Sequence, residues 1–539
     1  MSKENKNTLI MQGSILALAG IITKIIGFIY RIPMANFLGE QGNGLYSVAF
    51  GIYNIALTLS SYSLPLAVSK LVAYRLAKKE YRNAHRVFVE ALIFAVVAGG
   101  TAAGVLFFGA SGLEVMYNKP GLAAPLRVLA PTTFVVAILG VFRGYFQGKN
   151  NMVPTAISQI VEQFVNAVIS VAATYQCVRV YAESEQAAAY GAAGGTLGTL
   201  GGALAALFFF VFIYFCYRKS TQKRIQRDRS VEESTAHIYK ILFLTIVPVI
   251  LSQTIYQIGY TIDDYIFGDA MSAKGVSDAV ATSLQGVFNT QYTQLVNLPV
   301  AIATAMAAST IPNMVQSSYK EDKRELHKKI DGVIKLNMVI AIPSAVGLAV
   351  LARPIITLLF PSLVTYRDLA CNLLMLGSSA VVFYALSTIT TAVLQAGNYM
   401  KLPVIHCAVS LLIHIGIVYG LLNYTSLGLY ALIIGNITFP LLVATLNCFA
   451  VRRHMKYKWR MTEMFVKPLI ASVVMGACTF TSYYFVTLLV KKSLIGLIVA
   501  LFVAVLVYLK MLSVLDCFSH EELQEVPLGE KLEQIMKRI

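Results

Sequence analysis

Residues 493–514 read SLIGLIVALFVAVLVYLKMLSV, a stretch in which Lys510 is the one charged residue. A transmembrane helix needs about 20 consecutive, mostly apolar residues, so this stretch predicts a membrane crossing. Comparable runs recur along all 539 residues, of which 57% are hydrophobic and 13% charged. A soluble chain carries about a quarter of charged residues, and the composition therefore indicates a membrane protein.

The apolar runs predict an all-α polytopic membrane protein with about fourteen transmembrane helices. The expected spans cover residues 9–30, 45–72, 88–110, 122–142, 153–176, 188–217, 239–266, 282–311, 333–352, 370–395, 403–422, 427–450, 464–489 and 493–514.

The loops between these spans alternate in their content of lysine and arginine. Every second loop is basic, as expected of cytoplasmic loops in a multi-pass protein of the cell membrane, and both chain ends fall on that side. This pattern explains the formal net charge of +17 without nucleic-acid binding. The basic loops lie within residues 75–86, 143–149, 218–229, 320–329 and 452–460, and the short loop between spans ten and eleven carries Lys401.

A weak internal repeat suggests how the helices are grouped. LPLAV at residues 64–68 is echoed by LPVAI at 298–302, six spans later, and each is followed by a charged segment. Two six-helix lobes in a parallel pseudo-repeat, plus two C-terminal helices, account for this spacing. The expected divisions are an N-terminal lobe at 1–217, a basic cytoplasmic linker at 218–238, a C-terminal lobe at 239–451, helices thirteen and fourteen at 452–515, and a cytoplasmic tail at 516–539.

Ionisable and amide side chains inside the spans are the candidates for function, because such groups usually face a cavity or a partner. Lys24 and Arg31 are seven residues apart and therefore share one helix face. The candidate substrate-binding residues are Lys24, Arg31, Lys70, Arg127, Glu162 and Gln294, and the candidate ion-coupling residues are Asp263 and Asp264.

These candidates have ordinary alternatives. Arg31, Lys70 and Arg127 lie close enough to helix ends to place their charges among lipid headgroups. Glu162 and the two aspartates can each pair with a cation inside the bundle. The glycines of residues 194–202 form a small-residue stripe, which predicts close helix packing and no chemistry.

No motif of enzyme catalysis occurs in the sequence. There is no Walker A loop, H-E-x-x-H pair or G-x-S-x-G elbow, and the expected soluble segments are too short for a catalytic domain. The seven cysteines are scattered without a C-x-x-C pair, so no metal or other cofactor is expected. The sequence indicates a secondary transporter.

One stretch carries a family resemblance. Arg143-Gly144-Tyr145-Phe146-Gln147-Gly148, followed by Pro154-Thr155-Ala156, resembles the stage V sporulation protein B family. That family is grouped with the MurJ-type lipid II flippases in the multidrug/oligosaccharidyl-lipid/polysaccharide exporter superfamily. Lys24 to Gly27, Phe37-Leu38-Gly39 and Leu64-Pro65 match as well. The resemblance implies two lobes around a cationic cavity, with the last two helices bordering a groove for a polyprenyl tail.

The resemblance also implies a function. A flippase of this family would export a polyprenyl diphosphate-linked oligosaccharide, or a peptidoglycan precursor such as lipid II, by alternating access, with Na+ or H+ coupling at Asp263 or Asp264. Lys24 matches a family arginine by type, whereas Gln294 stands where MurJ-type proteins often have arginine. Two alternatives stay open: a drug or metabolite cation antiporter of the same fold, and a non-transporting scaffold for envelope or spore-cortex synthesis.

Overall fold

A computed structural model of the chain describes residues 3–304, 314 and 323–518. The end of predicted span eight, part of the basic segment before residue 323, and most of the predicted tail lie outside these residues.

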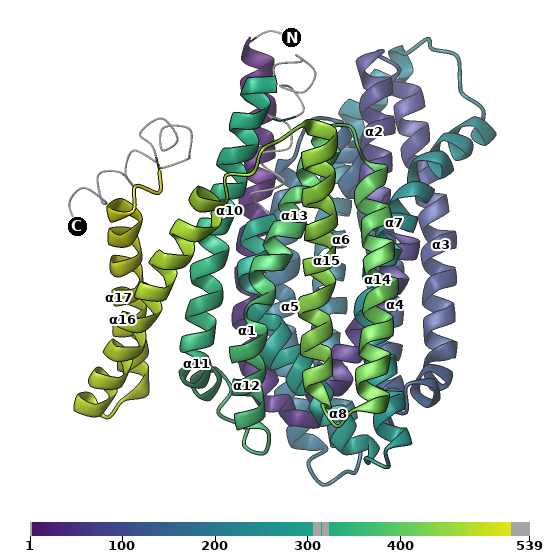
Figure 1. Ribbon diagram of the computed structural model, residues 1–539. Helices are drawn as coiled ribbons and strands as arrows, with labels where there is room; N and C mark the ends of the chain where they lie inside the picture. Colours follow the sequence, from purple (N-terminus) through teal and green to yellow (C-terminus); the bar gives the residue numbers. More distant parts are fainter. Residues whose placement is uncertain (1–2, 305–313, 315–322, 519–539) are drawn as a thin grey trace. The chain divides into compact units, whose positions relative to one another are not determined.

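The described residues form helices and no strands (Figure 1). Two short segments, η1 and η2, have the wider π-helical hydrogen bonding. The elements are α1 (Lys3–Ser60), α2 (Leu64–Ala77), α3 (Tyr81–Met116), α4 (Ala123–Gly148), α5 (Val153–Val180), α6 (Ala187–Arg227), α7 (Thr235–Ala273), α8 (Asp278–Gly286), η1 (Val287–Thr293), α10 (Lys323–Val350), α11 (Ala352–Leu359), α12 (Arg367–Gly377), α13 (Ala380–Ala396), α14 (Lys401–Tyr424), α15 (Leu429–Met455), η2 (Thr462–Val466), α16 (Lys467–Val490) and α17 (Ser493–Val514).

The first helical run is broken at Gly39, whose φ of 65° and ψ of −171° are not helical. Only glycine adopts this backbone conformation without strain. An unbroken helix of 58 residues would be about 87 Å long, nearly three times the thickness of a bilayer core. The break therefore separates two segments that are each long enough to cross a membrane.

Helix length and composition support several membrane crossings. Among the described residues, ten helical runs are long and apolar enough to span a bilayer, or eleven if the bent pair α12–α13 forms one span. Large apolar side chains cover the outside, including Phe108 and Leu489, which are 85% and 79% exposed. Such surfaces suit lipid rather than water. The all-helical multi-span prediction is confirmed, and the count of fourteen stays a prediction.

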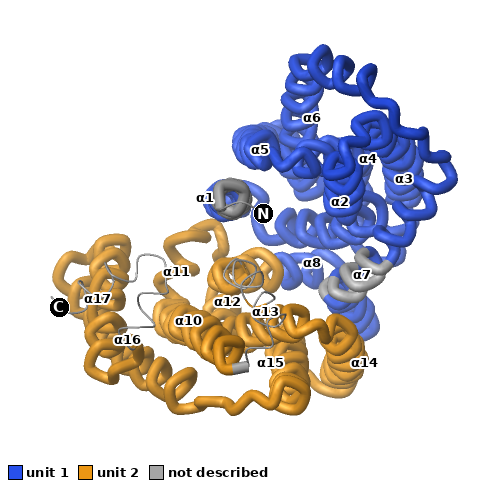
Figure 2. Tube along the Cα trace, turned by 90° about the horizontal axis from the view of Figure 1, so that it is seen from above, with its two compact units in different colours: residues 1–286 blue, residues 287–539 orange. Residues whose placement is uncertain are grey.

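The chain divides into two compact units, residues 1–286 and residues 287–539 (Figure 2). In unit 1, helices α2, α3, α4, α6 and α7 share a buried cluster that includes Phe88, Phe142 and Phe210. In unit 2, α10, α16 and α17 pack around Met475 and Tyr508. Helices α7 and α8 pack with unit 1. The division of the chain into two lobes at residues 218–238, which is inferred from the internal repeat, stays a prediction.

The predicted linker is anchored to unit 1 by its acidic residues. Glu233 pairs with Arg75, whose side chain is only 2% exposed. Glu232 accepts from Arg86 at 2.9 Å, and the backbone carbonyl of Val231 accepts from Asn83 at 2.9 Å. These contacts hold residues 231–233 against α2 and α3, so three of the arginines assigned to the basic 75–86 loop, Arg75, Arg82 and Arg86, form structural ion pairs.

The small-residue stripe on α6 lies against α5, as predicted. A Cβ atom added to Gly198 would lie 2.1 Å from the Ser170 hydroxyl and 2.5 Å from the Asn166 carbonyl oxygen. A Cβ added to Gly202 would lie 2.4 Å from the carbonyl oxygen of Glu162. Glycine is thus needed at these positions for the two helices to approach closely.

Replacing Gly198 with alanine should therefore destabilise unit 1 by about 1–3 kcal/mol, because the added methyl group forces the two helices apart. Thermal unfolding of the purified chain in detergent measures the effect. Gly104→Ala on α3 is the matched control, since its Cβ would meet nothing within 4 Å. An unchanged unfolding temperature for Gly198→Ala would show that the α5–α6 contact is looser than described.

Candidate functional site

The N-terminal part of α1 carries the two predicted cations. The helix is continuous through Lys24 and Arg31, so the two residues lie on one face, two turns apart. Gly27 lies between them on the same face, and a Cβ there would be 3.0 Å from the Gln163 amide nitrogen of α5. Gly27 therefore lies against α5, and Figure 2 shows α1 and α5 side by side in unit 1.

The two cations differ in their surroundings. Lys24 is exposed on unit 1, whereas Arg31 is half-buried beside Tyr30 and Tyr46, with its guanidinium 6.0 Å from the ring centre of Phe50. The Nε atom of Arg31 is buried and has no hydrogen-bond partner among the described residues. A buried donor without an acceptor in the protein is able to bind an acceptor oxygen of a ligand or of water.

A second guanidinium lies nearby on the same group of helices. Arg143, near the end of α4, binds the carboxylate of Glu162 on α5 at 2.5 Å, and its Nε donates to the Ser158 hydroxyl at 3.3 Å. Tyr53 of α1 interacts electrostatically with the negative charge of Glu162. Glu162 therefore pairs with a cation inside the bundle, which is the alternative given for it in the sequence analysis.

These residues form one polar cluster on α1, α4 and α5, hereafter the α1–α5 cluster. The contacts link Tyr30, Arg31, Tyr46, Tyr53, Arg143, Ser158, Glu162 and Asn166, and the exposed Lys24 is counted with them because it lies on the Arg31 face of α1. Asn166 joins it by donating to the Tyr30 hydroxyl at 3.3 Å. Three cations and one carboxylate give the cluster a formal charge of +2, which favours an anionic ligand.

The two aspartates of α7 occupy a different place in unit 1. Asp263 and Asp264 are 8% and 6% exposed. The side chain of Gln285 on α8 donates to the Asp264 carboxylate at 2.8 Å and to its carbonyl oxygen at 2.7 Å. Asp264 therefore belongs to a buried network between α7 and α8, and its carboxylate also lies beside α1, 3.7 Å from the position that a Cβ atom on Gly51 would take.

A lysine in the loop between α3 and α4 completes this network. Lys119 is 1% exposed and its Nζ lies 3.5 Å from the Thr282 hydroxyl. Burial lowers the pKa of Lys119 to about 8, although Asp264 and Asp278 oppose the shift. Burial, with the charge of Asp264, raises the pKa of Tyr117 to about 12. The buried Lys119 ammonium thus lies within the electrostatic influence of the buried Asp264 carboxylate.

The remaining candidates lie apart from both groups. Lys70 on α2 is exposed, and Arg127 on α4 is exposed and donates to Ser111 at 2.9 Å. Both positions suit the alternative of a charge placed among headgroups. Gln294 belongs to unit 2, one residue after η1, and its amide nitrogen is buried without a partner among the described residues. Gln291 and Thr293 have unpartnered oxygens in the same segment.

Comparison with known proteins gives relatives along nearly the whole chain. Stage V sporulation protein B of Bacillus subtilis is 25% identical over 529 residues, covering 97% of this chain and 98% of the relative. Lipid II flippase MurJ of the same organism is 24% identical over 484 residues, covering 86% of each chain.

Solved structures share the fold. An inward-facing MATE family transporter of the MOP superfamily gives a TM-score of 0.67 at 19% identity, covering 80% of this chain and 94% of its own. Lipid II flippase MurJ in an inward closed conformation gives 0.66 at 14% identity, covering 93% and 98%. The fold defined here is that of multi-pass membrane transporters and flippases, a class without catalytic enzymes.

The family follows from a longer match. Residues 9–318, which are 310 of the 539 residues, match the polysaccharide biosynthesis protein family, and the chain belongs to this family. The predicted resemblance to stage V sporulation protein B and MurJ-type proteins of the exporter superfamily is thereby confirmed.

Proposed function

We propose that this protein is a flippase that exports a polyprenyl diphosphate-linked oligosaccharide or peptidoglycan precursor, such as lipid II, across the cytoplasmic membrane. The half-buried guanidinium of Arg31, with its unpartnered Nε, is the observation that carries the proposal. A diphosphate cannot cross hydrocarbon without losing its hydration, and a fixed guanidinium replaces part of it through charge-assisted hydrogen bonds. The sequence relatives named above support the same class of substrate.

In this proposal each part of the α1–α5 cluster has a task. Lys24 is exposed two helical turns before Arg31 and attracts the headgroup, and Arg31 binds the diphosphate. Arg143 is already neutralised by Glu162, so it orders the cluster rather than adding free charge. Lys70 and Arg127 would act at the membrane surface, and the unpartnered amide of Gln294 would hydrogen-bond to the sugars.

Transport would proceed by alternating access in a protein whose two termini both face the cytoplasm. We assign ion coupling to Asp263 and Asp264, with Na+ or H+ as the driving ion. Protonation of Asp264 would remove the negative charge that faces Lys119 and so change the balance of this buried network. Each charge moved across the membrane contributes about 2.3 kcal/mol per 100 mV.

Complementation tests the proposal: a bacterial strain depleted of its own lipid II flippase should grow when it expresses this chain. Failure to grow, with the protein inserted in the membrane and translocating no lipid-linked diphosphate sugar in proteoliposomes, would contradict it. Resistance to cationic drugs without translocation would instead indicate the cation antiporter. Rescue by a chain that lacks both Lys24 and Arg31 side chains would contradict their assignment to headgroup binding.

A further inference from the structure

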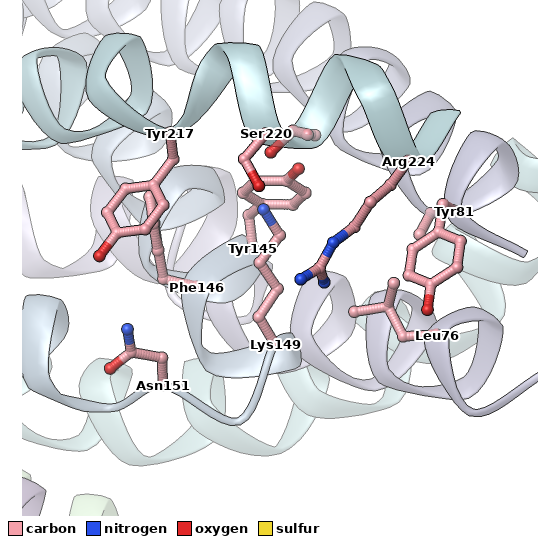
Figure 3. A pocket seen from close by; sticks show the side chains of 11 residues that line it. Leu76, Tyr81, Tyr145, Phe146, Lys149, Asn151, Tyr217, Ser220 and Arg224 are labelled. Carbon is pink, nitrogen blue, oxygen red and sulfur yellow. The ribbon is translucent and has the colours of Figure 1, made fainter. Parts of the chain in front are cut away.

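Unit 1 contains a cavity of about 400 Å³ at the end where α2 and α4 finish and α3 begins, and its lining shares no residue with the α1–α5 cluster (Figure 3). The extended last turns of α6 close its remaining side. By the charge pattern of the loops this end is cytoplasmic. The lining residues are Leu76, Tyr81, Ala84, Tyr145, Phe146, Lys149, Asn151, Tyr217, Ser220, Thr221 and Arg224.

Two cations converge on this cavity. The ammonium of Lys149 lies 3.9 Å from the ring centre of Tyr145, and the guanidinium of Arg224 lies 5.9 Å from that of Tyr81. In Figure 3 the two charged groups point toward the same space from opposite walls. Aromatic faces of this kind hold a cation in place without neutralising its charge.

No carboxylate lines the described cavity, and two acidic residues at this end of unit 1, Asp228 and Glu80, have partners of their own. Asp228 accepts from the backbone nitrogens of Arg82 at 2.7 Å and Ser230 at 2.8 Å. Glu80 accepts from Asn83 at 3.4 Å. Among the described residues neither Lys149 nor Arg224 has an ion-pair partner, so the cavity holds two positive charges that the protein itself leaves unbalanced.

Solvation alone does not explain this arrangement. Lys149 is half-buried, and burial together with the nearby charge of Arg224 lowers the pKa of Lys149 to about 8. A lysine placed only to be solvated would lie in water and keep its ordinary value. The protein therefore tolerates an unfavourable cation pair here, and an anion bound between the two would relieve the repulsion.

The other polar groups at this cavity are suited to an oxygen-rich anion. Ser220, Thr221 and Tyr217 offer hydroxyl groups. The side-chain oxygen of Asn151 accepts from the backbone nitrogen of Val153 at 3.3 Å, which leaves its amide hydrogens available as donors. A phosphate group has several strong acceptor oxygens and matches a site made of cations and donors.

We propose that this cavity binds a phosphate group through Lys149 and Arg224, at a site separate from the α1–α5 cluster. The volume falls within the range of small-ligand sites and exceeds what a phosphate alone needs. The phosphate can come from the headgroup of an anionic phospholipid at the membrane surface or from a soluble phosphate compound. The inference does not depend on the proposed flippase activity.

Two binding measurements on the purified full chain test the site and separate the sources. Native mass spectrometry counts phosphatidylglycerol retained from mixed micelles with phosphatidylcholine, and calorimetry follows titration with inorganic phosphate. Lys149→Gln and Arg224→Gln should each weaken the phosphate-dependent binding about tenfold, because each removes a charge-assisted contact. Lys223→Gln is the matched control, since Lys223 is exposed on the same turn of α6 and does not line the cavity.

Binding should also depend on pH through Lys149. The titratable and charged groups that face it are His85 of α3, Arg224 of α6 and Tyr145 of α4. Lys149 is charged below about pH 8. The affinity for phosphate should therefore fall between about pH 7.5 and 9.5. A bound anion should raise the pH at which Lys149 loses its proton. The fall should persist in His85→Gln and disappear in Lys149→Gln.

Each outcome decides the proposal. Weakened lipid retention alone identifies a headgroup site, and weakened titration with inorganic phosphate identifies a site for soluble phosphate. If neither ligand binds, or if Lys149→Gln and Arg224→Gln behave like Lys223→Gln in both measurements, the proposal is overturned. Arg224 lies on the exposed rim, so its variant keeps the test valid should Lys149→Gln fold poorly.

Discussion

Replacing Arg31 with alanine should reduce translocation of a lipid-linked diphosphate headgroup at least about 100-fold. The guanidinium offers several donors, including the buried Nε, and each charge-assisted hydrogen bond to a phosphate oxygen is worth about 1.5–3 kcal/mol. Loss of two such bonds corresponds to a factor of about 100 or more in binding. Translocation in proteoliposomes, scored by an enzyme that reaches only the outer leaflet, measures the effect.

Two further variants make this result interpretable. Arg31→Lys keeps the charge but loses the planar arrangement of donors, and it should retain part of the activity. Arg229→Ala removes an exposed arginine from the segment after α6 and should leave the rate within about twofold, as expected of a solvated surface charge. If Arg31→Ala inserts normally and transports at the native rate, Arg31 does not bind the substrate.

The second large effect concerns the stability of the Arg143–Glu162 pair. Both side chains are largely buried, at 15% and 25% exposed. Removing one partner leaves an uncompensated charge, which costs about 3–5 kcal/mol in a buried setting. Arg143→Gln and Glu162→Gln should therefore each lower the unfolding temperature markedly in detergent, and the double variant should recover at least half of the loss.

An exposed ion pair in unit 2 provides the comparison. Arg353 and Asp368 are 2.7 Å apart, with side chains 73% and 79% exposed. Breaking that pair with Asp368→Asn should cost less than about 1 kcal/mol, because water solvates both charges. A double variant at Arg143 and Glu162 that is no more stable than the worse single variant would show that the two residues are not energetically coupled.

Helix type and membrane character could be predicted from the sequence because apolar runs near 20 residues have few alternative structures. The last predicted span, 493–514, coincides with α17. Ends were harder to place: the sixth span, predicted to stop at 217, continues to Arg227 as part of α6. Beyond the bilayer, the residue at which a helix ends is determined by capping and local contacts, and hydropathy does not measure these.

The candidate site was only partly predictable. Lys24 and Arg31 follow from helix periodicity alone, and Glu162 follows from the rarity of carboxylates in spans. The charge pattern places its partner Arg143 in a cytoplasmic loop, whereas Arg143 belongs to α4, and the short turn between α4 and α5 brings the ends of the two helices together. The proximity of Lys119 to Asp264 depends on contacts between segments that are 145 positions apart in the chain. Local sequence patterns do not indicate such contacts.

The break at Gly39 has a consequence for how the sequence can vary. Any side chain at this position would oppose the φ of 65° and ψ of −171° that end one helical segment and begin the next. Most lipid-facing positions accept any apolar residue of similar size. Saturation mutagenesis should therefore find residue 39 nearly invariant in functional clones, while highly exposed positions such as Phe108 vary freely among apolar residues.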